Sequence, residues 1–121
     1  MSRYIDGFVI PVPKDRIDDY RRTAEKASTV WKEHGALDYW ECVGDDLVAM
    51  EGMIGFKQLA DAKDDETVVF AWVVFESREA RDEANKKIMA DPRLKDMMDP
   101  ENQVFDCKRM AYGGFKQLVH A

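Results

Sequence analysis

The segment TVVFAWVVF at residues 67–75 constrains the fold more than any other part of the chain, because it carries no charge and only one hydroxyl. The side chains of a β-strand alternate between the two faces of its sheet, so both faces of this strand are apolar. One face receives Val68, Phe70, Trp72 and Val74, and the other receives Val69, Ala71, Val73 and Phe75. The fold must therefore cover this strand from both sides.

The hydrophobic pattern along the rest of the chain predicts three further strands and two main helices. The predicted strands are residues 4–13, 36–46, 67–75 and 103–115, and the predicted helices are residues 15–34 and 78–91. The first helix has apolar or small residues at a 3-4 spacing and ends before Gly35, and Ser77 caps the second. Residues 47–66 form an irregular insert, in which residues 55–62 suit a short helix.

The order of these elements is β-α-β-β-α-β, which predicts an α+β fold of the ferredoxin-like type. In that fold, four antiparallel strands form one sheet and two helices cover one of its faces. A chain of 121 residues is long enough for one such domain, residues 1–121, and too short for two ordinary domains.

Helices on one face leave the other face of the sheet, with Trp72 or Phe75, in water. Exposing several large apolar side chains forgoes about 1.5–3 kcal/mol each, against a stability of about 5–15 kcal/mol for a whole domain. A second copy of the chain is the simplest cover. We therefore expect a homodimer, arranged as a dimeric α/β barrel, with a pocket lined by aromatic residues in any space between the two sheets.

Composition limits the partners and the location of the protein. The chain has 18 basic and 24 acidic residues, a net charge of -6 and a pI near 4.9, so nucleic acid is an unfavourable partner. No apolar run approaches the roughly 20 residues of a membrane helix, and the N-terminus lacks the apolar core of a signal peptide. With Cys42 and Cys107 expected as reduced thiols, we predict a cytoplasmic protein without membrane association.

Charged residues inside the predicted strands are candidates for a functional site. Asp6 lies in a strand that is otherwise apolar on both faces. A structural hydrogen bond and a catalytic role explain such a carboxylate equally well. Glu41 is a second catalytic candidate, and Arg109 in the last predicted strand is a candidate for ligand binding. Asp106 and Lys108, in the same strand, suit a solvated edge instead.

His34 is the third catalytic candidate, because a histidine at a helix terminus can act as a base. Its more ordinary role is to interact with the last carbonyls and the dipole of the helix. The only other histidine is His120, and no ligand spacing or cofactor motif accompanies the pair, so we predict neither a metal nor a cofactor. Three rings, those of Trp72, Tyr4 and Phe8, are candidates for stacking on a flat organic ligand.

Four segments together resemble the YbaA-like proteins, a small bacterial family of unknown function: YIDGFVIPVPKD, WKEHGALDYWECVGDD, ETVVFAWVVFESREARDEANKKIMADPRLKDM and FDCKRMAYGGF. The resemblance covers most of the chain and is weakest across residues 47–63. It implies a ferredoxin-like subunit of the dimeric α/β-barrel superfamily. That superfamily includes small monooxygenases, haem-degrading enzymes, lactone isomerases and stress-induced proteins, and it transfers no catalytic residue to this chain.

Three functions of different classes remain open. The first is binding or transformation of a small hydrophobic or aromatic metabolite without a cofactor, as in an oxygenase or isomerase, in a site between the sheets or under the helices. The second is a non-catalytic dimeric stress or interaction protein with a solid core. The third is RNA binding, because some YbaA-like proteins bear a name that links them to signal-recognition-particle RNA. Against it, the strand at residues 67–75 lacks the basic residue and the glycines of RNA-recognition domains.

Overall fold

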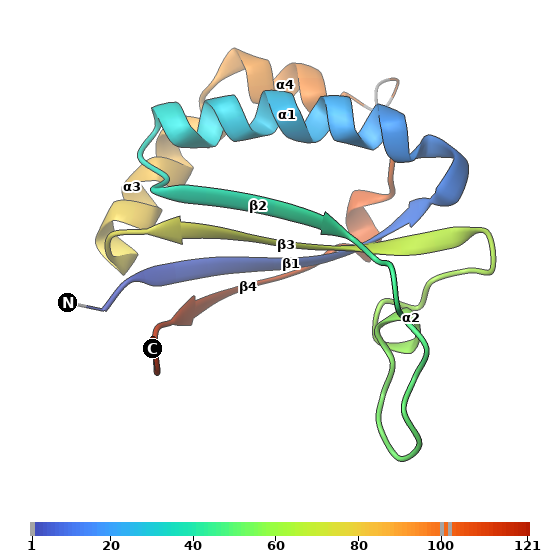
Figure 1. Cartoon of the computed structure of the whole chain (residues 1–121). Helices are drawn as coiled ribbons and strands as arrows, with labels where there is room; N and C mark the ends of the chain where they lie inside the picture. The colour runs from blue at the N-terminus through green and yellow to red at the C-terminus, as the bar shows by residue number, and fades with distance from the viewer. Residues whose placement is uncertain (1, 100, 102) are drawn as a thin grey trace.

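The computed structural model describes residues 2–99, 101 and 103–121 and has one antiparallel sheet of four strands (Figure 1). The strands are β1 (Tyr4–Pro13), β2 (Asp38–Val43), β3 (Glu66–Phe75) and β4 (Ala111–Lys116), in the spatial order β2-β3-β1-β4. The helices are α1 (Ile17–Glu33), α2 (Phe56–Leu59), α3 (Arg78–Met89) and α4 (Pro92–Met97), with short 3-10 turns at η1 (Lys14–Arg16) and η3 (Cys107–Arg109). The prediction of an α+β ferredoxin-like fold is confirmed.

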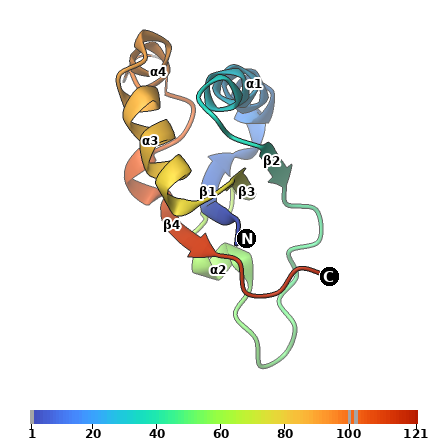
Figure 2. The ribbon, with the colours of Figure 1, turned by 90° about the vertical axis from the view of Figure 1, so that its left-hand side faces the viewer.

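Helices α1, α3 and α4 lie on one side of the sheet, whereas α2 and the loop before it project on the other side (Figures 1 and 2). The register sends alternate residues of β3 to the two sides. Phe75 points to the helices and is 0% exposed, while Phe70 points away from them and is 45% exposed. The choice that the sequence left open is thereby settled: Trp72 belongs to the uncovered side and Phe75 to the core.

Local signals in the sequence account for the helix ends. The hydroxyl of Ser77 accepts a hydrogen bond from the Ala80 N–H at 3.0 Å and starts α3. Asp91 caps α4 by accepting from the Arg93 N–H at 2.9 Å, with Pro92 at the first helical position. Gly35 follows α1 with φ of +119°, a conformation that side chains disfavour.

The last predicted strand, residues 103–115, is wrong in its first half. The strand begins only at Ala111, so Asp106, Cys107, Lys108 and Arg109 are not strand residues. The Asp106 carboxylate accepts a hydrogen bond from the Lys108 N–H at 3.0 Å, which stabilises the 3-10 turn η3 in place of an extended chain. The other strands and the two main helices are confirmed to within a few residues at each end.

Candidate functional site

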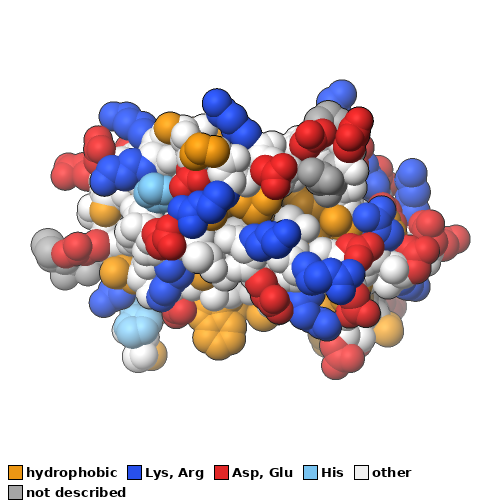
Figure 3. All heavy atoms as spheres, turned by 90° about the horizontal axis from the view of Figure 1, so that it is seen from above, with side chains coloured by type: hydrophobic (Ala, Val, Ile, Leu, Met, Phe, Trp, Pro, Cys, Tyr) orange, Lys and Arg blue, Asp and Glu red, His pale blue; other side chains and the backbone are white. Residues whose placement is uncertain are grey.

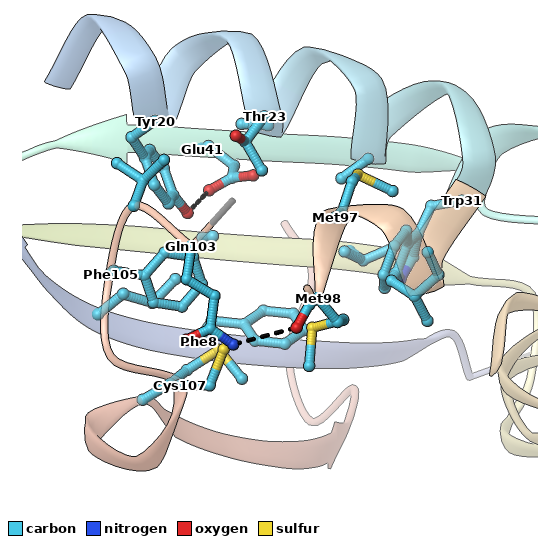
Figure 4. A pocket seen from close by; sticks show the side chains of 18 of the residues that line it. Phe8, Tyr20, Thr23, Trp31, Glu41, Met97, Met98, Gln103, Phe105 and Cys107 are labelled. Carbon is cyan, nitrogen blue, oxygen red and sulfur yellow. Dashed lines mark hydrogen bonds between the residues drawn. The ribbon is translucent and has the colours of Figure 1, made fainter. Parts of the chain in front are cut away.

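A cavity of about 160 Å³ lies between the sheet and the helices (Figure 4). Its floor comes from β1, β2 and β3, its roof from α1 and α4, and its far wall from residues 103–110. The lining is almost entirely apolar, with aromatic rings and thioethers that include Phe8, Trp31, Met97, Met98, Phe105 and Met110. The sequence left two positions open for a pocket, between two sheets or under the helices. This cavity lies under the helices.

Small residues explain why this part of the core is hollow. Ala24 and Ala27 of α1 and Ala71 of β3 all line the cavity. On α1 the two alanines lie between Tyr20 and Trp31 in one apolar stripe, so large rings bound a stretch of helix with almost no side-chain volume. The helix is therefore held above the sheet by its two rings, and the alanines leave a gap beneath it.

The polar end of the cavity is the carboxylate of Glu41. The Tyr20 hydroxyl donates a hydrogen bond to Glu41 Oε1, and the Tyr39 hydroxyl donates to Glu41 Oε2 at 2.6 Å. Figure 4 shows the Tyr20 hydroxyl pointing at the carboxylate from the helix above. Burial raises the pKa of both tyrosines, and the neighbouring negative charge of Glu41 raises it further, so both phenols remain protonated donors.

Glu41 also reaches a second, more open groove between α1 and β2. This groove, of about 300 Å³, shares Tyr20, Ala24, Tyr39 and Glu41 with the cavity. Polar side chains of α1, among them Arg21, Glu25 and Ser28, line its outer part. The carboxylate and its two phenols therefore form the boundary between an apolar interior and a groove open to the surface.

Of the predicted site residues, Phe8 and Glu41 come together in the cavity wall. Tyr20 and Trp31, which belong to the apolar stripe of the first helix, also line the cavity and are not among the predicted site residues. The signal was present in the same stripe, because two alanines between two large rings on one helix face indicate a space below that face.

Asp6 and Tyr4 belong to a different cluster, where β1 meets α3. Asp6 is buried, and its Oδ1 lies 3.3 Å from Arg81 Nη1. Arg81 donates to the hydroxyls of Tyr112 at 2.8 Å and Tyr4 at 3.2 Å, and its guanidinium stacks on the Tyr4 ring. Burial raises the pKa of Asp6 and outweighs the opposing effect of Arg81. The cluster ties α3 to the sheet, and none of its members lines the cavity.

His34 joins two helices. Its Nε2 lies 2.9 Å from Asp91 Oδ2, at the start of α4. Arg93 bonds the same carboxylate and also Glu33 at 2.6 Å, so the end of α1 is fastened to α4. Hydrogen bonds from Arg93 and His34 hold the pKa of Asp91 well below its usual range. His34 does not line the cavity.

Arg109 makes a two-pronged ion pair with the buried Glu66, with N–O distances of 2.8 and 2.9 Å. These bonds lower the pKa of Glu66 to about 2. Because Arg109 closes η3, and Cys107 and Met110 beside it line the cavity, this ion pair holds the far wall of the cavity in place. Its guanidinium faces Glu66 rather than the cavity.

Trp72 lies on the side of the sheet away from the helices. Its ring stacks on that of Trp40 at 5.6 Å and meets that of Phe70 at 5.4 Å. We call the strand positions on this side the open face; its larger apolar side chains are Ile5, Val9, Trp40, Val68, Phe70, Trp72, Val74 and Phe115. All four strands are among the described residues, and none of their positions on the open face carries Lys or Arg.

In the part of the chain that the structure describes, no group of three or more His, Cys, Asp or Glu side chains is arranged to hold a metal ion. None of the helices found there has both the length and the apolar composition required to cross a membrane.

The chain resembles known proteins along most of its length. The model of a family described as a protein of unknown function (DUF1428) matches residues 3–107. The chain belongs to this family. Uncharacterized protein YbaA of Escherichia coli strain K12, which has 44% identity over 118 residues and 97% coverage of both chains, is similar to this DUF1428 protein. The resemblance to YbaA-like proteins is thereby confirmed.

Solved structures resemble the DUF1428 chain in fold. A NIPSNAP family protein of unknown function from Agrobacterium tumefaciens matches with a TM-score of 0.57 at 16% identity, covering 98% of this chain and 91% of the other. A protein described as a dimeric ferredoxin-like protein, from an uncultured marine organism, matches with a TM-score of 0.52 at 15% identity and coverages of 98% and 96%. At such identities the likeness concerns the fold alone.

Proposed function

We propose that this protein binds a small hydrophobic molecule, of about the size of one aromatic ring, in the cavity under α1. The observation that carries the proposal is an apolar cavity of about 160 Å³ closed at one end by a carboxylate with two phenol donors. A dry apolar cavity of roughly 150 Å³ is large enough to accept benzene. The cavity therefore suits a single ring better than a fused ring system.

The polar end specifies which kind of ring is preferred. A carboxylate oxygen has two lone pairs, and one lone pair of each Glu41 oxygen accepts a hydrogen bond from a tyrosine hydroxyl. The other lone pair can accept a hydrogen bond from a ligand. A ligand that brings its own O–H or N–H to Glu41 would gain a charge-assisted hydrogen bond in an apolar setting. We therefore expect phenols and related donors to bind more tightly than hydrocarbons of the same shape.

The same contact permits chemistry without a cofactor. Glu41 is placed to accept a proton from an acidic O–H or C–H of the bound molecule, with the electron pair of that bond remaining on the ligand. Returning the proton at another carbon would complete an isomerisation. Glu41 is thus our candidate base, and an isomerase-like reaction is the catalytic version of the proposal.

Binding of phenol and toluene to the purified protein, followed by ligand-observed NMR, tests the proposal. We expect phenol to bind more tightly than toluene and Glu41→Gln to reduce that preference. Ala27→Leu should fill the cavity and abolish binding of both probes, whereas Ala90→Leu, at an exposed position after α3, should leave it intact. Equal binding to the wild type and the Ala27→Leu variant would place any ligand elsewhere and contradict the proposal.

We also propose that the protein is a homodimer joined through the open face. The support is a sheet face with several half-exposed aromatic rings, Trp40, Phe70 and Phe115 among them, and a related fold described as dimeric. A cytoplasmic location is part of the same proposal, supported by the free thiols of Cys42 and Cys107. Sedimentation velocity at micromolar concentration tests the dimer, and a folded single subunit would contradict it.

A further inference from the structure

The chain between β2 and α2 forms an arm that projects from the open side of the sheet (Figures 1 and 2). We define the arm as residues 45–55. Its base is fixed: the Gly44 N–H donates to the Val68 carbonyl at 2.8 Å, and the Phe56 ring packs against the Phe70 ring at 5.9 Å. Its tip is a turn closed by a hydrogen bond from the Met53 N–H to the Met50 carbonyl at 3.0 Å.

The arm carries large apolar side chains into water. Val48 is 86% exposed, Met50 69%, Met53 67% and Ile54 72%. Near the C-terminus, Leu118 and Val119 are also almost fully exposed. A single exposed leucine or methionine needs no explanation, but four on one short arm beside an uncovered aromatic sheet face form an apolar surface larger than a monomer usually carries.

We propose that the arm is an exchange arm, which packs against a second copy of this chain and adds a contact to the dimer formed through the open face. The inference rests on the proposed dimer and goes beyond it, because the sheets alone could form the interface.

The arm is long enough to reach a facing subunit. Two sheets that pack face to face lie about 10 Å apart. The longer leg of the arm, residues 45–49 before the turn that begins at Met50, spans roughly 17 Å when extended, and the arm points away from the helices of its own subunit. An arm of that length passes the plane of the facing sheet, so its tip lies beside the partner instead of between the sheets.

The rings of the open face alone are a small interface for a stable dimer. A stable dimer buries about 800 Å² on each partner, whereas the partly exposed rings of the open face, at roughly 150–250 Å² each when fully buried, supply only part of this. The arm and the sheet face are continuous through the contact of Phe56 with Phe70. The arm therefore enlarges the continuous surface that a partner can cover.

The charge of the arm argues against a membrane as its partner. The arm contains Asp45, Asp46 and Glu51 and no Lys or Arg. An acidic arm is repelled by the anionic lipid of a membrane surface. With a lipid surface disfavoured, the continuity of the arm with the open face favours a second copy of the chain as the occupant.

Methionine oxidation tests the arm with the protein as it exists, because Met89 on α3 is a matched internal reference. In one subunit the exposed fraction of Met89 is 68% and that of Met53 is 67%. Met89 belongs to α3, on the side of the sheet that the helices cover. In the dimer we expect dilute hydrogen peroxide to oxidise Met50 and Met53 several-fold more slowly than Met89, as peptide mass spectrometry would record.

Substitution gives a second readout. Met50→Ser combined with Met53→Ser should raise the dimer dissociation constant by about 100-fold or more, since each side chain is lost twice per dimer. Met89→Ser should leave the constant unchanged.

The outcomes separate the arm from the dimer. A dimer in which Met50, Met53 and Met89 are oxidised at one rate overturns the exchange arm and leaves the sheet interface standing. A monomer overturns both the exchange arm and the sheet interface. Protection of Met50 and Met53 that appears only when anionic lipid vesicles are added overturns the exchange arm. Protection that is lost on dilution of the wild-type dimer supports the arm.

Discussion

The two faces of the sheet use the same kind of residue for opposite purposes. On the covered face, apolar side chains of the strands meet α1, α3 and α4 and form a core that leaves one gap under the alanines of α1. On the open face, rings such as Trp40 and Phe115 remain half exposed. The outer surface above the helices is instead covered with charged side chains of both signs (Figure 3).

This contrast shows that hydrophobicity alone does not tell a core position from a position on the open face. Residues next to each other in β3 are equally apolar, yet one packs under the helices and the next points away from them. Substitutions at matched positions on the two faces test this difference.

The largest expected effect comes from Phe75→Ala on the covered face. Removing this fully buried ring should lower the free energy of unfolding by about 3–5 kcal/mol, as urea denaturation would measure. Phe70→Ala, on the open face, should cost the isolated subunit much less because the ring is already 45% exposed. Equal losses in the two variants at protein concentrations below the dimer dissociation constant would remove the distinction between the faces.

The next effect concerns association. Phe115→Asp places a charge on the edge strand β4, within the apolar open face, and should weaken dimerisation by about 2–4 kcal/mol, measured by sedimentation equilibrium. Lys95→Asp, on exposed α4, is the control and should not change the association. A Phe115→Asp variant that dimerises like the wild type would move the interface away from this face.

A smaller effect is expected where η3 closes the covered face. Arg109→Met should lower the stability at pH 7 by about 1–3 kcal/mol, because Glu66 keeps its burial and loses its charged donors. The pKa of Glu66 is lowered to about 2 in the folded protein, so its contribution is complete above the unfolded pKa of about 4.3. That contribution is lost as the pH falls from about 4.3 towards 2.

Acid titration of stability therefore provides the check for this ion pair. The wild type should lose stability more steeply than the Arg109→Met variant between those two pH values. Parallel curves would show that the ion pair contributes nothing to the folded state.

The smallest effect is expected at the cavity itself. Tyr39→Phe removes one of the two donors to Glu41 and should cost about 0.5–1.5 kcal/mol of stability, by thermal or urea unfolding. Tyr4→Phe, in the Arg81 cluster, is the matched control for loss of a phenol hydroxyl and should leave phenol binding unchanged. If Tyr39→Phe also left phenol binding unchanged, the polar end of the cavity would have no part in recognition.

Much of the fold could be predicted from particular residues. Ser77, Pro92 and Gly35 each mark a helix end because they act on their immediate neighbours. The last strand was placed too early because Asp106 bonds the backbone two residues on, and apolar alternation does not report such a bond. Of the candidate site residues, Phe8 and Glu41 line the cavity, whereas Asp6, His34 and Arg109 are paired with Arg81, Asp91 and Glu66. A charged residue in a strand shows that a partner is needed, but the partner lies far away in the chain.

The chain alone was enough to establish the element order, the one-sided cover of the sheet and the apolar character of its second face. These follow from periodicity and composition, which are properties of neighbouring residues. Only the tertiary structure decided which face of β3 the helices cover, that three alanines lie around one gap, and that two tyrosines from different elements meet one carboxylate. Such features depend on the register of strands and on the distance between helix and sheet, both of which are fixed by packing across the whole molecule.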